Sequence, residues 1–169
     1  MTKDDLHFAL AAHQAHRVRS AWIASLSSAC GERIHDTAFL SIDQTKKLKA
    51  DFFDIVKNKN ITTTQYWKAE EKDRFCATLA NLASSATNWH VILFTANDQY
   101  FGAVRLPAYC ALRHPMQIWQ VVNEDLAFAF EDLSSGVCLE LSHYDADGRH
   151  VPEGIFELTT WGVFTCGGV

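Results

Sequence analysis

Lysine is missing from the second half of this 169-residue chain, because every lysine lies at or before Lys72. Residues 89–169 contain three arginines against ten carboxylates, whereas the residues before them carry twelve basic and ten acidic side chains. A charge partition of this kind bears on binding partners rather than on fold. Phosphate binding requires clustered lysine and arginine, so we expect the acidic half to bind no nucleic acid.

Long apolar runs and paired cysteines are also lacking. No apolar run approaches the roughly 20 residues that span a bilayer, and the chain opens with MTKDDLHF, where a secretory signal would need an apolar core. The five cysteines include no Cys-x-x-Cys pair, which favours reduced and mostly buried thiols. We therefore expect a cytoplasmic protein with no membrane segment and no disulfide framework.

Residue clusters with the spacing of a catalytic or metal site are absent as well. His13 and His16 lie about one helical turn apart, but no third ligand follows at a recognisable spacing. The segment from Asp145 to Gly148 resembles a fragment of a calcium loop, yet the position of the final glutamate falls on Gly154 or Ile155. An acidic turn is the better interpretation. We expect no metal, no cofactor and no catalytic residue, and binding rather than enzymatic activity.

Helical periodicity dominates the first 88 residues. Apolar positions from Asp5 to Ala29 form one stripe on a helical wheel, and a second helix is expected to begin at Ser41-Ile-Asp-Gln44, which has capping-box spacing. Spacings of three and four among apolar residues predict a third helix over Gln65–Ser85, with the preceding threonines as its cap.

From Trp89 onward the periodicity changes, and seven of the eight glycines and all three prolines fall in this part. Alternating apolar residues and turn sequences predict strands. The expected strands are Trp89–Thr95, Tyr100–Leu106, Met116–Val122, Leu126–Glu131, Val137–Tyr144 and Ile155–Thr165.

These elements predict an α+β fold, with about three N-terminal helices packed on one face of a curved, mostly antiparallel sheet of about six strands. We expect a single domain over residues 1–169, with a helical part (1–88) and a sheet part (89–169).

The acidic turns of the second half are the candidate partner-binding residues, because almost no lysine lies near them in the sequence. Trp161 joins them as a possible aromatic anchor, although it belongs to the core if helices cover its side of the sheet. The candidate residues are Asp98, Glu124, Asp125, Asp132, Asp145, Asp147, Glu153 and Trp161.

One region resembles the immunity proteins of bacterial toxin–immunity pairs, including those of contact-dependent inhibition. The resemblance rests on Trp119, the Asn123-Glu-Asp-Leu126 segment, Gly136 and the Glu157-Leu-Thr-Thr-Trp-Gly162 segment. It implies a cytoplasmic inhibitor that binds one cognate toxin. Many toxins are nucleases with basic clefts, which an acidic surface would complement.

The element order suits a second function equally well. In a cone-shaped α+β domain, three helices close one side of a curved sheet around an apolar pocket that binds a small molecule or substrate. His90, His143, Asp98 or Glu140 would then project inward, and the sequence does not choose among them.

Overall fold

The computed structural model of the chain describes residues 3–86, 88–122, 125–145 and 147–164. It confirms the α+β class, with an open six-stranded antiparallel sheet. The helical segments are α1 (Lys3–Cys30), η1 (Asp36–Ala38), α2 (Ile42–Val56), η2 (Ala69–Glu71), α3 (Lys72–Ser85), α4 (Asp98–Phe101), α5 (Ala108–Arg113), α6 (Pro115–Val122) and η3 (Gly162–Phe164). No helix in these ranges is long and apolar enough to cross a membrane.

All neighbouring strands of the sheet are antiparallel, and their spatial order is β1-β6-β5-β4-β2-β3. The strands are β1 (Thr63–Lys68), β2 (His90–Phe94), β3 (Val104–Pro107), β4 (Leu126–Ala129), β5 (Gly136–Tyr144) and β6 (His150–Trp161). The edge strand β1 precedes α3 in the chain but pairs with the last strand, β6. Strands and helices therefore occur on both sides of residue 88, which is no boundary between a helical part and a sheet part.

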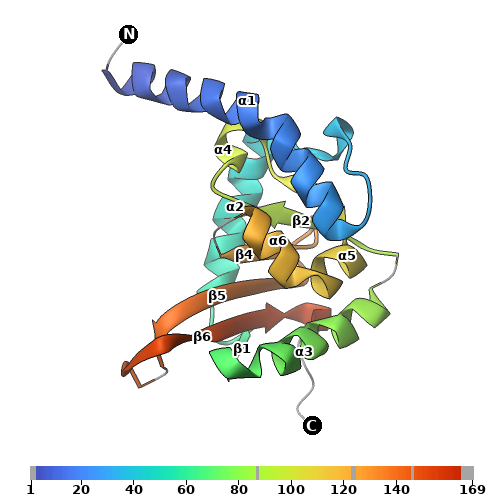
Figure 1. Cartoon of the computed structure of the whole chain (residues 1–169), viewed down its shortest axis with the longest axis vertical. Coiled ribbons are helices and arrows are strands. Elements are labelled where there is room, and N and C mark those ends of the chain that lie inside the picture. The colour runs from blue at the N-terminus through green and yellow to red at the C-terminus, as the bar shows by residue number, and fades with distance from the viewer. Residues whose placement is uncertain (1–2, 87, 123–124, 146, 165–169) are drawn as a thin grey trace.

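One face of the sheet is covered by α1, α3, α5 and α6 (Figure 1). Phe128 of β4 and Leu158 of β6 point into this face and are fully buried with Leu79 of α3 and Ile118 of α6. The stripe along α1 reaches the same core at Leu26. Burial of this apolar surface is the main stabilising contribution, at about 25 cal/mol for each Å² removed from water.

The inner part of the opposite face is covered by α2. Phe52 of α2 packs on Phe94 and Trp161, with ring centroids 5.0 Å and 5.3 Å apart. Its close approach is possible because the β4 residues on this face are Ala127 and Ala129. The predicted helices thus do not share one face, since α2 lies on the other side of the sheet from α1 and α3.

The predicted capping box of α2 is confirmed. The Ser41 hydroxyl accepts a hydrogen bond from the Gln44 amide at 3.2 Å, and the Gln44 side chain accepts one from the Ser41 amide at 3.1 Å. These reciprocal bonds satisfy two backbone donors at the helix N-terminus.

Two predicted elements have the wrong secondary structure. Residues 116–122 belong to helix α6, not to a strand: Pro115 occupies its first turn, and Ile118 and Val122, four residues apart, face the core. Conversely, the predicted third helix begins only at Lys72, because the threonines and aromatics of Thr63–Lys68 form strand β1. The predicted β2–β3 pairing is present, but the short helix α4 interrupts its connection.

Candidate partner-binding groove

The hairpin of β5 and β6 extends past the helices that cover the sheet (Figure 1). β4 pairs only with the first part of β5, up to Leu139, and β1 pairs with β6 only as far as Ile155. The outer part of the hairpin, residues 142–145 and 147–153, is named the hairpin tip. Its side chains are exposed or half-buried, so polar groups placed there can reach a partner.

Asp145 holds the turn of the hairpin tip. Its carboxylate accepts hydrogen bonds from the backbone amides of Asp147 at 3.0 Å and Arg149 at 2.8 Å. Gly148 adopts a φ of +75°, a left-handed conformation that favours glycine. This is the acidic turn predicted from the sequence, and it leaves the Asp147 side chain exposed.

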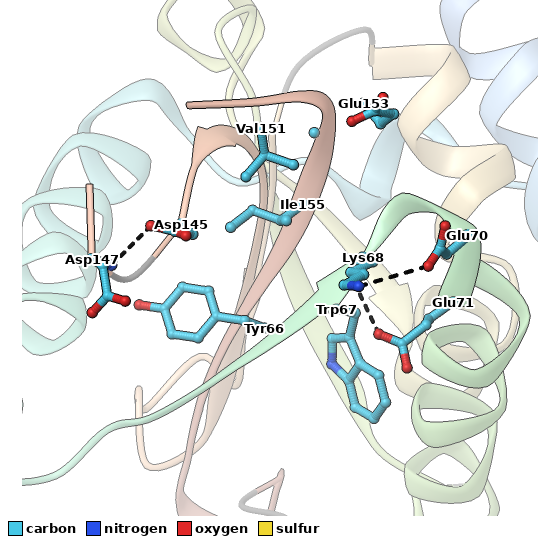
Figure 2. A pocket seen from close by; sticks show the side chains of 11 residues that line it. Tyr66, Trp67, Lys68, Glu70, Glu71, Asp145, Asp147, Val151, Glu153 and Ile155 are labelled. Atoms are coloured by element: carbon cyan, nitrogen blue, oxygen red, sulfur yellow. Dashed lines mark hydrogen bonds and ion pairs between the residues drawn. The ribbon is translucent and has the colours of Figure 1, made fainter. Parts of the chain in front are cut away.

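An open groove of about 800 Å³ lies between the hairpin tip and the end of β1 (Figure 2). Its lining comes from two parts of the chain that are distant in sequence: the end of β1 with η2, and the hairpin turn with the start of β6. Five of the lining side chains are carboxylates, namely Glu70, Glu71, Asp145, Asp147 and Glu153. This surface is named the acidic groove.

Apolar and aromatic side chains lie between these carboxylates. In Figure 2, Val151 and Ile155 of β6 lie between the turn of the hairpin and β1, and the Tyr66 ring points toward Asp147. Tyr66 is 43% exposed, and partial burial followed by the nearby Glu157 carboxylate raises the pKa of its hydroxyl. The groove therefore combines an apolar floor with an acidic rim, the composition that accepts the stem and the charged head of lysine or arginine.

Basic side chains offset only part of this charge. Lys68 lies 3.9 Å from Glu70, while Arg74 and Arg149 each pair with one carboxylate of the rim at 3.4 Å. Glu153 has no ion pair or hydrogen bond with any residue that the structure describes. The side chains of these pairs are largely exposed except that of Glu71, which is 36% exposed, so a partner's cations can compete with the pairs at little cost.

Further carboxylates lie beside the groove on the face that α2 covers elsewhere. Glu140 of β5 lies directly opposite Glu157 of β6, and Glu157 is in turn opposite Tyr66 of β1. Burial and then the Glu140 charge raise the pKa of Glu157, against a smaller opposing effect of Lys59. Like charges in directly opposed positions destabilise a sheet.

The structure brings three of the predicted partner-binding residues together: Asp145, Asp147 and Glu153 all line the acidic groove. Asp125 is exposed at the start of β4, where its carboxylate accepts a 3.4 Å hydrogen bond from the amide of Leu141. Asp132 lies in the β4–β5 turn, at the opposite end of β5 from the groove. Three of the predicted carboxylates therefore form one cluster, while Asp125 and Asp132 lie apart from it. Glu124 lies outside the described residues.

Two of the predicted residues are buried, and their assignment to a partner surface was wrong. Asp98 is 2% exposed; it accepts hydrogen bonds from Lys49 Nζ at 3.0 Å and from the Thr95 amide at 2.9 Å. Trp161 is 3% exposed beneath Phe52, and its Nε1 donates to the Leu133 carbonyl at 3.0 Å. Trp161 is core because α2 covers its face of the sheet.

Sequence reasoning missed the β1 side of the groove. Tyr66, Glu70 and Glu71 fell within a predicted helix, so they were not considered as partners of the hairpin turn. The concentration of β-branched and aromatic residues in Thr63–Lys68 was the local feature that could have indicated a strand.

Three of the described thiols, those of Cys30, Cys110 and Cys138, are in environments that suppress nucleophilic reactivity. Burial raises the pKa of Cys30 to about 12 and that of Cys110 to about 11. Burial, followed by the charge of Glu140, likewise raises the pKa of Cys138, whose Sγ donates to Glu140 Oε1 at 3.4 Å. Each of these thiols stays protonated at neutral pH, whereas attack on a substrate requires the thiolate.

The side chains considered for a ligand pocket lie in separate parts of the fold. Asp98 is buried in its ion pair with Lys49, Glu140 is exposed on β5, His143 is exposed on the hairpin tip, and His90 begins β2.

Within the described ranges no group of three or more histidine, cysteine or acidic side chains could hold a metal ion. The groove is thus the part of the described structure where charge, apolar surface and accessibility coincide. Comparison of the chain with protein-family models, with curated proteins and with solved structures finds no match.

Proposed function

We propose that this chain is a stoichiometric inhibitor of a basic protein, acting in the bacterial cytoplasm as the immunity protein of a toxin encoded beside it. The toxin would be a nuclease, whose basic active-site surface the acidic groove covers.

The acidic groove is the observation that carries this proposal. Its rim collects five carboxylates from two separate parts of the chain around an apolar floor, on a part of the sheet that the helices leave accessible. A nuclease cleft must attract phosphate, so it presents lysine and arginine of the kind that such a groove complements. Complementary charge accelerates association and disfavours other partners.

The side chains divide into two roles. Asp147 and Glu153 are exposed, and they steer a basic partner toward the groove. Tyr66 contributes a half-exposed aromatic ring, the type of side chain that anchors protein interfaces.

Co-expression tests the function itself. The protein encoded by the neighbouring gene is expressed alone, with this chain, and with a variant carrying Asp147→Lys and Glu153→Lys. We expect the neighbour to be toxic alone, the native chain to restore growth, and the variant to protect poorly while it retains its thermal stability.

A variant with Asp51→Lys and Asp54→Lys is the matched control, because these exposed carboxylates of α2 make the same charge change away from the groove. It should protect as well as the native chain does. A harmless neighbour, or toxicity that this chain leaves unchanged, would contradict the proposal. Tight binding or turnover of a metabolite by the purified chain would favour the pocket function instead.

A further inference from the structure

Part of the second face of the sheet has no helix over it. Along β5 the side chain of Cys138 is 4% exposed beneath α2, while Glu140, the next residue on the same face, is exposed. Along β6 side-chain exposure likewise increases toward the outer part of the sheet, from the buried Thr159 to the half-buried Glu157. α2 ends at Val56 and therefore leaves the outer part of this face uncovered.

A row of carboxylates crosses the uncovered part. Glu140 and Glu157 are opposite each other, and Asp125 directly precedes Leu126, whose partner is Leu139, so that it continues the row onto β4. Tyr66 lies opposite Glu157 on β1 and connects the row to the acidic groove. Asp125, Glu140 and Glu157 are named the acidic row.

The acidic row has little internal compensation. The described structure contains no ion pair to Asp125, Glu140 or Glu157, and Lys59 acts on Glu157 only as a charge at longer range. Directly opposed like charges cost stability, and natural proteins commonly retain such costs where function needs them.

We infer that the uncovered part of the sheet is a docking surface for an extended segment of the protein partner that bears arginine or lysine on alternate residues. The inference rests on the proposed function and adds the chemistry of the bound segment. Charge complementarity selects this occupant: three carboxylates with no ion-pair partner in the described structure face the partner, beside an aromatic ring that accepts a cation over its face.

The spacing of the surface defines the segment. Adjacent strands lie about 4.8 Å apart, so a row over three strands spans about 10 Å. In an extended segment, alternate side chains lie about 6.6–7 Å apart. Two basic residues separated by one residue can therefore lie over the acidic row together, with their aliphatic stems toward Tyr66 and Ile155.

Titration with a short peptide tests the docking surface without the partner. The probe is acetyl-Gly-Arg-Ser-Arg-Gly-amide, and its matched control carries citrulline at both arginine positions, which keeps the shape and removes the charge. Amide chemical shifts of the isotopically labelled chain are followed by NMR at low salt. We expect saturable shifts confined to residues around the acidic row and Tyr66, and at least a fivefold weaker response to the citrulline peptide.

Variants then test the named side chains. Glu140→Gln with Glu157→Gln should weaken peptide binding about fivefold or more, whereas Asp51→Asn with Asp54→Asn on α2 should leave it unchanged. Thermal unfolding confirms that both variants are folded. Shifts spread over all acidic surfaces, or equal binding by the two variants, would overturn the inference. The same shifts with calcium or magnesium chloride alone would assign the row to a metal ion and would also overturn it.

The outcomes separate this inference from the proposed function. If the Glu140→Gln, Glu157→Gln variant protects cells and binds the toxin as tightly as the native chain, the docking surface is wrong while the inhibitor function stands. If the peptide maps to the acidic row but the neighbouring protein is harmless, the inhibitor function fails while the docking surface stands.

Discussion

Single residues show most clearly which carboxylates stabilise the fold and which lie exposed at the surface. Asp98 and Asp147 are both turn-associated aspartates, yet Asp98 is 2% exposed and paired with Lys49, whereas Asp147 is exposed in a surface ion pair with Arg149. The difference arises from α2, which places Lys49 against the Thr95–Asp98 segment from a distant part of the sequence.

Removing the Asp98 carboxylate should therefore destabilise the fold. In Asp98→Ala, Lys49 loses its ion-pair partner, although it keeps its hydrogen bond to the Thr95 carbonyl, and the buried Thr95 amide loses its acceptor, so the free energy of unfolding should fall by about 2–4 kcal/mol at pH 7. Urea denaturation measures this free energy of unfolding. Asp98→Asn keeps an acceptor and should lose less; an Ala variant as stable as the native chain would show that the pair is dispensable.

For Glu157 we predict the opposite effect, a gain in stability when the carboxylate is removed. Because its pKa is raised in the folded chain, folding favours the protonated acid; the cost of the charged form is absent at low pH and appears as pH rises through that pKa. Glu157→Gln should raise the melting temperature at pH 7 by about 1–3 °C, and this gain should vanish near pH 3. Calorimetry at both pH values tests the sign, with Asp51→Asn as the neutral control.

At the scale of the element, the hairpin of β5 and β6 acts as a rigid support for surface charge. Asp145 fixes its turn through backbone amides, which leaves Asp147 and Glu153 without a structural task beyond one exposed ion pair. Charge can thus be altered on this hairpin without loss of its shape, provided that Asp145 is kept.

Charge reversal at Asp147 and Glu153 should slow association with the proposed toxin partner by about tenfold at low salt and flatten its dependence on salt, with little change in dissociation. Stopped-flow mixing with an inactivated toxin variant measures both rates. Reversal of Asp51 and Asp54 on α2 should change association much less. A variant that dissociates faster at an unchanged association rate would mean that these carboxylates form direct contacts instead of steering.

Local patterns predicted those elements whose stability is local. The capping box at Ser41 and the acidic turn at Asp145 depend on neighbours within four residues, and both are confirmed. β1 was mistaken for helix because its partner, β6, is distant: the hydroxyls of Thr64 and Thr159 meet across 95 positions. α6 was mistaken for a strand because its short apolar run fits either period. Of the acidic groove, the sequence therefore predicted the carboxylates of the hairpin and missed the β1 side.

At the scale of the whole molecule, the thiols report on the integrity of the core. Cys30 and Cys110 are buried with raised pKa values, so the native chain holds them protonated at pH 8, well below about 11–12. Alkylation by iodoacetamide should therefore require unfolding, and its rate at these two sites should increase with urea as the fold opens. Peptide mass spectrometry follows each site, and rapid labelling in the absence of urea would contradict the buried assignment.

The strand order has a consequence for how the chain acquires its binding surface. β1 is synthesised early, but its only sheet neighbour among the described residues is β6, the last strand of that part of the chain. Closing so long a loop carries an entropic cost and makes this pairing a slow, late contact in folding. Both walls of the acidic groove depend on that contact. A ribosome-bound chain that lacks β6 therefore lacks a complete acidic groove, and under the proposed inhibitor function protection lags behind synthesis by the time that the final strand needs to add to the sheet.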